Sequence, residues 1–211
     1  MSEVTVFQED SISGFLHVPD VSSNQGLVLT HGAGANCQTP LLVAVAEAFE
    51  GAGFTVLRCD LPFRQKRPGG PPHPSQAGAD REGLRAAVVA LRRMVSGRIV
   101  LGGHSYGGRQ ASIVASEDSS VSDALLLLSY PLHPPNKPEQ LRTAHFLQLQ
   151  TPALFVHGTK DPFGTTAELQ TALRLIPSAT ELSIVEGAGH DLKRGRFDIA
   201  ALILERLHLI K

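Results

Sequence analysis

The stretch VLGGHSYGGRQAS, residues 100–112, places a single serine between two pairs of glycines. An apolar run typical of a buried strand leads into the first pair, and a run typical of a helix follows the second. G-x-S-x-G between a strand and a helix is the pattern of a nucleophile elbow, a sharp turn that exposes the serine hydroxyl. A phosphate-binding loop is disfavoured, because no segment completes G-x-G-x-x-G and no Lys-Ser/Thr pair follows. The pattern therefore predicts that Ser105 is a nucleophile.

Short apolar runs alternate with longer helical runs on both sides of this turn. We expect strands at residues 4–7, 12–18, 26–31, 54–59, 98–101, 124–128, 153–156 and 181–185, and helices at 41–50, 80–95, 107–116, 166–175 and 196–207. The alternation predicts an α/β fold with a mostly parallel, doubly wound sheet after an N-terminal antiparallel hairpin. We expect one domain over residues 1–211 and no lid domain, because the connection 129–151 is too short for one.

A serine nucleophile needs a histidine as its base and a carboxylate that orients the histidine, here in the chain order Ser, acid, His. Asp161 follows the predicted strand 153–156, and His190 follows the predicted strand 181–185. Carboxyl ends of parallel strands meet at one edge of the sheet, where such folds bind their ligands. The sequence therefore predicts a triad of Ser105, His190 and Asp161, with Asp60 as the second candidate for the acid. His157 is expected to support the Asp161 loop.

Acyl transfer also needs two N–H donors for the developing oxyanion. The backbone N–H of Tyr106, directly after the nucleophile, is the first candidate. The second is the N–H of Ala33, because the small residues of THGAGAN after the strand 26–31 let a carbonyl oxygen approach the backbone.

The proline- and glycine-rich loop at residues 61–78 is the expected wall of the site. Its Arg64 and Lys66 are candidate contacts for an anionic group on the substrate. The alternative is an ordinary solvated loop, since charged side chains usually face water. Arg109, in the helix behind the elbow, is expected to tether loops rather than to contact substrate.

The whole chain resembles an α/β-hydrolase, because HGAG, GHSYGG, GTKDPFG and GAGH occur in the order and spacing of that superfamily. The missing lid makes it similar to the dienelactone-hydrolase-like group. GGHSYGGRQAS and GTKDPFG resemble most a small branch of predicted hydrolases that includes a testis-expressed protein and a scaffold subunit of a histone acetyltransferase complex. Dienelactone hydrolases carry a cysteine nucleophile where this chain has Ser105, so their substrate is not expected to be the substrate of this protein.

Composition narrows the class of protein. Apolar residues make up 42 % and charged residues 18 % of the 211 residues, a globular composition, and the formal net charge of −1 gives no reason to expect nucleic acid or a membrane as partner. Two cysteines, Cys37 and Cys59, are too few for a disulfide scaffold or a cysteine-rich metal site. We expect a cytoplasmic monomer or small homo-oligomer without metal or organic cofactor.

These features predict a serine hydrolase that cleaves small carboxylic esters or thioesters through an acyl-enzyme. Two alternatives stay open: a catalytically silent interaction module with the same fold, and a peptidase or acyltransferase that uses the same triad. The natural substrate, its chain length and the pathway do not follow from the sequence.

Overall fold

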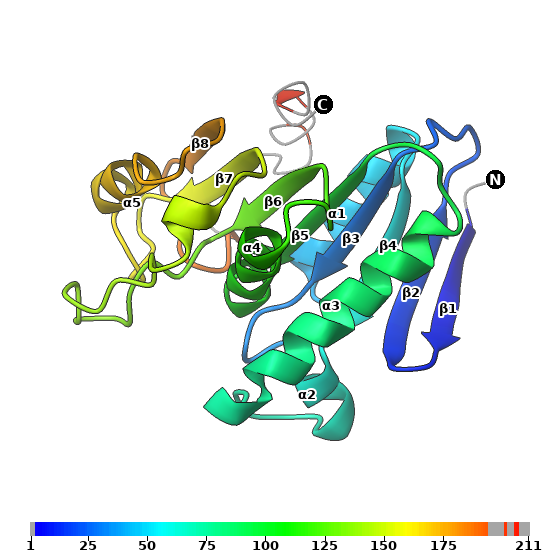
Figure 1. The fold of residues 1–211 in the computed structure, drawn as a ribbon, viewed down its shortest axis with the longest axis horizontal. Helices are drawn as coiled ribbons and strands as arrows, with labels where there is room; N and C mark the ends of the chain where they lie inside the picture. The colour runs from blue at the N-terminus through cyan, green and yellow to red at the C-terminus, as the bar shows by residue number, and fades with distance from the viewer. Residues whose placement is uncertain (1–2, 194–200, 202–204, 207–211) are drawn as a thin grey trace.

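The computed structural model describes residues 3–193, 201, 205 and 206. Among these residues, eight strands form one sheet in the order β1-β2-β4-β3-β5-β6-β7-β8 (Figure 1). β2 pairs antiparallel with β1 and β4, and all other neighbours pair parallel. The strands are β1 (Glu3–Glu9), β2 (Ile12–Val18), β3 (Gly26–Thr30), β4 (Thr55–Asp60), β5 (Ile99–His104), β6 (Ala124–Leu128), β7 (Ala153–Gly158) and β8 (Thr180–Val185). The predicted mostly parallel sheet with an antiparallel hairpin is confirmed.

Helices cover both faces of the sheet. In Figure 1, α3 and α4 cross in front of the strands and α1 lies behind them. The helices are α1 (Pro40–Gly51), α2 (Pro62–Lys66), α3 (Ala77–Arg92), α4 (Tyr106–Glu117) and α5 (Thr166–Leu173), with single 3₁₀ turns at η1 (Pro74–Gln76) and η2 (Phe146–Gln148). The helix predicted at residues 196–207 lies mostly outside the described residues. None of the described helices is long and apolar enough to cross a membrane.

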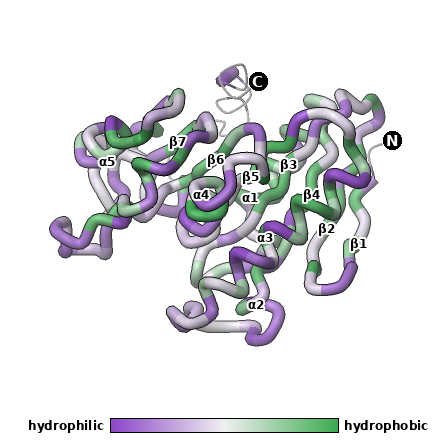
Figure 2. Tube along the Cα trace, viewed as in Figure 1, coloured by the Kyte–Doolittle hydropathy of each residue, from purple (hydrophilic) through white to green (hydrophobic). Residues whose placement is uncertain are grey.

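The core consists of two apolar layers, one on each face of the sheet. The side chains of β6 alternate between them: Leu125 and Leu127 pack with α3, α4 and α5, whereas Leu126 and Leu128 pack with α1. All these leucines are inaccessible to solvent, and complete burial of such a side chain contributes about 1.5–3 kcal/mol. Figure 2 shows the hydrophobic strands at the centre and hydrophilic residues along the connecting loops. Burial on both faces explains why the central parallel strands β3, β5, β6 and β7 read as largely continuous apolar runs.

The segment predicted as a loop at residues 61–78 is more ordered than expected. It contains α2 and η1, and α3 begins at Ala77 rather than at Asp80. The carboxylate of Asp80 is buried inside α3 and accepts hydrogen bonds from the Phe63 N–H (3.0 Å) and the Tyr106 hydroxyl (2.7 Å). A residue that the sequence suggests as the start of a helix therefore joins three helices instead.

The carboxyl ends of β3, β5, β7 and β8 lie along one edge of the sheet, as the parallel register requires. The connection between β6 and β7 spans residues 129–152 and contains η2 as its one regular element. No lid domain therefore covers this edge in the described part of the chain, as predicted.

Candidate active site

Ser105 lies at the turn between β5 and α4 with backbone angles φ 52° and ψ −116°. This conformation is rare for a residue with a side chain and marks a strained turn. Its flanking glycines are required by close approach: a Cβ on Gly103 would lie 2.7 Å from the backbone of Gly107, and a Cβ on Gly107 would lie 2.5 Å from the carbonyl oxygen of His31. The turn thus packs against the β3 loop and holds the Ser105 hydroxyl at the carboxyl edge of the sheet.

The structure brings Ser105, His190 and Asp161 together. The Nε2 of His190 lies 2.8 Å from the Ser105 Oγ, and its Nδ1 lies 2.8 Å from Oδ2 of Asp161. The other carboxylate oxygen of Asp161 accepts the N–H of Phe163 at 2.8 Å. The carboxylate is fully buried, whereas the imidazole of His190 is 21 % exposed. The three side chains, which span 85 residues of the sequence, therefore form one continuous chain of hydrogen bonds.

Asp60, the second candidate for the acid, lies elsewhere. Its carboxylate accepts the N–H of Cys37 at 2.7 Å and lies 3.4 Å from the Nε2 of His31. It therefore organises the loop after β3 and does not contact His190.

Two further side chains hold the His190 loop in place. His104 donates its Nε2–H to the carbonyl oxygen of His190 at 2.7 Å. Burial lowers the pKa of His104 to about 4, so this imidazole is neutral at neutral pH. The ring of Phe163 packs against the imidazole of His190 with 4.2 Å between ring centroids. These contacts fix the orientation of the imidazole relative to Ser105.

His157 supports the Asp161 loop, as expected from the sequence. It is fully buried, its Nε2 bonds to the carbonyl oxygen of Gly164 at 2.8 Å, and its Nδ1 lies 3.9 Å from Oδ2 of Asp161.

The residues of the two candidate oxyanion donors, Ala33 and Tyr106, both line the cavity beside Ser105. Tyr106 is the first residue of α4, where a backbone N–H has no intrahelical acceptor. Ala33 follows β3 and lines the same cavity as Ser105 and Tyr106. The Tyr106 hydroxyl donates to Asp80, and burial, together with this bond, raises the pKa of Tyr106 well above its ordinary value. Its side chain therefore anchors the start of α4.

Arg64 holds the Ala33 loop instead of facing the cavity. Its guanidinium is buried and donates hydrogen bonds to the backbone carbonyl oxygens of Ala33, Ala35, Arg67 and Gly70 at 2.7–3.0 Å. Lys66 is exposed at the end of α2, and neither residue is among those that line the cavity beside Ser105. This differs from the sequence-based prediction that they contact substrate. The physical reason is that the planar guanidinium satisfies carbonyl groups that two neighbouring loops would otherwise leave unpaired.

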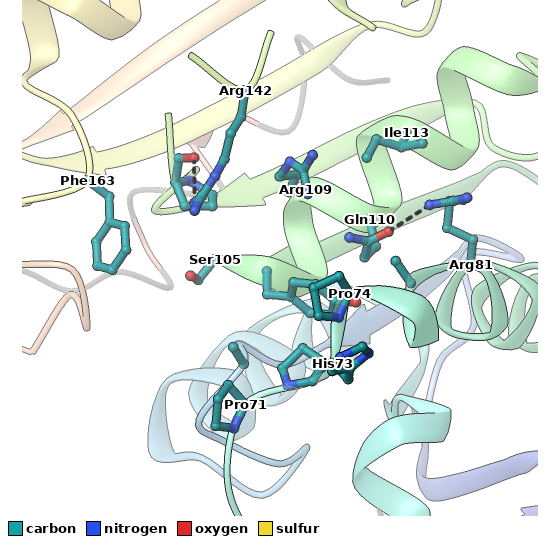
Figure 3. Close-up of a pocket in the computed structure, with 15 residues that line it drawn as sticks. Pro71, His73, Pro74, Arg81, Ser105, Arg109, Gln110, Ile113, Arg142 and Phe163 are labelled. Carbon is teal, nitrogen blue, oxygen red and sulfur yellow. Dashed lines mark hydrogen bonds between the residues drawn. The ribbon is translucent and has the colours of Figure 1, made fainter. Parts of the chain in front are cut away.

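The cavity beside Ser105 has a volume of about 530 Å³ (Figure 3). One wall comes from residues 71–74, so part of the predicted wall loop does border the site. Phe163 lies across the cavity from Pro71 and Pro74 (Figure 3). Arg109 and Arg142 lie above Ser105 in the same view. No motif in the sequence points to Arg142, and the sequence-based expectation for Arg109 is that it tethers loops. Among the described residues, no cluster of His, Cys, Asp and Glu side chains is arranged to hold a metal ion.

Comparison with known proteins agrees with this architecture. A family model described as an alpha/beta hydrolase domain matches residues 23–199, and the chain belongs to this family. It is therefore an enzyme of the hydrolase class.

Solved structures show the same fold at low sequence identity. A dienelactone hydrolase from Anabaena variabilis is 20 % identical, with a TM-score of 0.75 over 99 % of this chain and 97 % of that chain. Est1E from Butyrivibrio proteoclasticus is 17 % identical, with a TM-score of 0.73 over 98 % of each chain. XC6422 from Xanthomonas campestris, described as a serine hydrolase without a lid, is 18 % identical, with a TM-score of 0.70 over 99 % of this chain and 91 % of that chain. The resemblance to lidless, dienelactone-hydrolase-like proteins is thereby confirmed at the level of the fold.

Proposed function

We propose that this hydrolase cleaves small carboxylic esters or thioesters, with Ser105 as nucleophile, His190 as general base and acid, and Asp161 as the residue that orients His190. The observation that carries the proposal is the unbroken hydrogen-bonded chain from Asp161 Oδ2 through both ring nitrogens of His190 to the Ser105 Oγ, with 2.8 Å at each step. A serine hydroxyl is a weak nucleophile unless a base takes its proton, and this geometry supplies that base.

The reaction begins when the Ser105 Oγ attacks the carbonyl carbon and its proton passes to the Nε2 of His190. The buried carboxylate of Asp161 accepts the Nδ1–H and stabilises the resulting imidazolium. The carbonyl oxygen gains negative charge and accepts hydrogen bonds from the backbone N–H groups of Ala33 and Tyr106. One such donor typically contributes about 3 kcal/mol at the transition state. When the tetrahedral intermediate collapses, the carbon–oxygen or carbon–sulfur bond to the leaving group breaks, and His190 returns its proton to that group.

Water completes the cycle. It attacks the acyl-enzyme, His190 takes a proton from the water, and Ser105 leaves with that proton as the free hydroxyl. The site has no lid over the cavity in the described part of the chain, so water reaches the acyl-enzyme directly. This favours hydrolysis over transfer of the acyl group to another acceptor.

The cavity supports a small substrate. Its walls are largely apolar, with prolines 71, 72, 74 and 131, Ile113 and Phe163 among the lining residues. A volume of about 530 Å³ lies within the usual range for small-molecule sites of roughly 300–1,000 Å³. Short acyl or alkyl groups therefore fit beside the nucleophile, and a longer chain would extend into solvent.

The test is covalent labelling by a fluorophosphonate combined with turnover of short aryl esters and thioesters. We expect wild type to be labelled and active, and Ser105→Ala to lose both properties. Ser112→Ala is the matched control, because the Ser112 Oγ also lies 2.8 Å from a histidine nitrogen, the Nε2 of His145, but neither residue is among those that line the cavity. Equal labelling of wild type and Ser105→Ala, or a wild type that turns over none of these compounds and is not labelled, would contradict the proposal and favour a silent interaction module.

A further inference from the structure

Two arginines on the cavity wall have no acidic partner. Arg109 comes from α4, one turn after the nucleophile, and Arg142 comes from the connection between β6 and β7; both are half-buried and line the cavity that contains Ser105. In the described part of the chain, neither forms an ion pair. The Nε of Arg109 is buried and has no hydrogen-bond partner there. Arg142 donates one Nη1 bond, to the carbonyl oxygen of Pro131 at 3.2 Å.

The two guanidinium groups lie close to one another. Figure 3 shows both on the wall above Ser105, and the pKa of Arg142 is lowered by burial and then by the positive charge of Arg109. The pKa of His145 next to them falls to about 4 through burial and the same charge. Two like charges in a partly desolvated place raise the free energy of the empty site, because neither charge is compensated.

Arg81, on the rim of the same cavity, shows the contrast. Its guanidinium lies 3.4 Å from the carboxylate of Glu117 and 3.3 Å from the amide oxygen of Gln110. It is thus compensated by the protein itself. Arg109 and Arg142 differ in that their missing counter-charge can come from a molecule in the cavity.

We propose that Arg109 and Arg142 bind a carboxylate of the substrate, so that the enzyme acts on esters that carry a second, unesterified carboxyl group. This inference rests on the proposed function, because it places the scissile carbonyl at Ser105 and the free carboxylate at the arginines of the same cavity. A carboxylate oxygen accepts guanidinium N–H groups in short, charge-assisted hydrogen bonds, and two arginines satisfy both oxygens. The apolar walls between the arginines and the prolines suit a short methylene chain that joins the two ends.

The test compares two substrates that differ in one charge: mono-4-nitrophenyl adipate and its neutral methyl ester. We expect wild type to have a kcat/KM about tenfold or more higher for the anionic ester, since a hydrogen bond to a charged group corresponds to roughly 10- to 100-fold. Arg109→Gln and Arg142→Gln each lower this ratio about tenfold. Arg92→Gln removes the same charge where it pairs with Asp123 at the opposite end of the sheet, and leaves the ratio unchanged.

Ser105-dependent turnover of the neutral ester tests the proposed function separately. A binding measurement keeps the inference testable without turnover: by calorimetry, Ser105→Ala should bind monomethyl adipate more tightly than dimethyl adipate, and the added Arg109→Gln should abolish the difference. Equal kcat/KM for the two esters in wild type, or an equal loss for both in the arginine variants, would overturn the proposal. Inorganic phosphate that competes more strongly than adipate would overturn the assignment to a carboxylate.

Discussion

Acidification should destabilise this protein through buried histidines, and His104 allows the effect to be isolated. Burial lowers its pKa from 6.5 to about 4 in the folded state. As the pH falls below about 6.5, His104 takes up a proton in the unfolded chain but not in the folded chain. The free energy of unfolding therefore decreases progressively until the pH reaches about 4. The stability should therefore be highest above the unfolded pKa.

The magnitude follows from the shift. Each pH unit between the two pKa values costs about 1.4 kcal/mol, so the 1.5 units from pH 6.5 to 5 correspond to about 2 kcal/mol from His104 alone. A domain with a typical total stability of about 5–15 kcal/mol would register this clearly. His17 and His31, whose pKa values burial also lowers, add to the loss in wild type.

The assay is urea unfolding at pH 7 and pH 5. His104→Gln keeps an N–H donor for the carbonyl oxygen of His190 but does not titrate, so the loss of stability between the two pH values should be smaller than in wild type by about 2 kcal/mol. His104→Phe should show the same reduction in pH dependence, but with lower activity at pH 7, because it lacks the bond that holds the His190 loop. If His104→Gln loses as much stability as wild type between pH 7 and 5, the reasoning is wrong.

Three further substitutions test the active site and its supports. Asp161→Asn should lower kcat on a neutral ester by about 10³- to 10⁴-fold with little effect on the unfolding transition, because an amide orients the imidazole poorly and cannot stabilise its cation. Gly107→Ala should reduce stability by about 1–3 kcal/mol, measured by thermal unfolding, because its Cβ would lie 2.5 Å from the carbonyl oxygen of His31. Arg64→Met should cost about 3 kcal/mol in urea unfolding and lower kcat, because it removes the donors for four backbone carbonyl groups, two of them in the Ala33 loop.

Each of these substitutions has a matched control in the chain. Asp191→Asn changes an exposed carboxylate directly after His190 and should leave kcat within about twofold, since surface changes of this kind have effects within about 0.5 kcal/mol. Gly51→Ala adds a methyl group where no atom lies within 4 Å, and should not lower the unfolding temperature. Lys66→Met removes an exposed charge from the same helix as Arg64 and should change neither stability nor kcat. A control that behaves like its partner would refute the corresponding prediction.

Much of the fold could be predicted because its strands are defined locally. The runs at residues 99–101, 124–128 and 153–156 are apolar without alternation, which indicates strands buried on both faces and joined by crossover helices. That arrangement then determines which strand ends share an edge of the sheet. Asp161 and His190 could be selected from the sequence because each lies in the loop that follows a predicted strand, residues 153–156 and 181–185.

The parts that could not be predicted depend on contacts between distant segments. The proline-rich run at residues 61–78 has few local signals for a helix, but the burial of Phe63 and the bond from its N–H to Asp80 stabilise α2 in the folded protein. Arg64 looked like a solvated or substrate-facing cation, because nothing in its own neighbourhood in the sequence shows the carbonyl groups of Ala33 and Ala35. Arg142 lies in a connection without a motif and faces the cavity only because that loop folds back toward α4.

Among the residues that the structure describes, those that build this site have their polar atoms hydrogen-bonded within the protein, whereas those that would bind a substrate have donors left free. Asp161 has both carboxylate oxygens bonded, and Arg64 has its guanidinium bonded to backbone carbonyl groups. Rotation of either side chain would break bonds that the surrounding loops cannot replace, so these residues keep the site in one geometry before a substrate enters. Arg109 and Arg142 face the cavity with donors that no described carboxylate uses. An uncompensated charge in a partly buried place destabilises the free enzyme. Two such charges beside Ser105, the proposed nucleophile, are explained if the substrate supplies the missing negative charge.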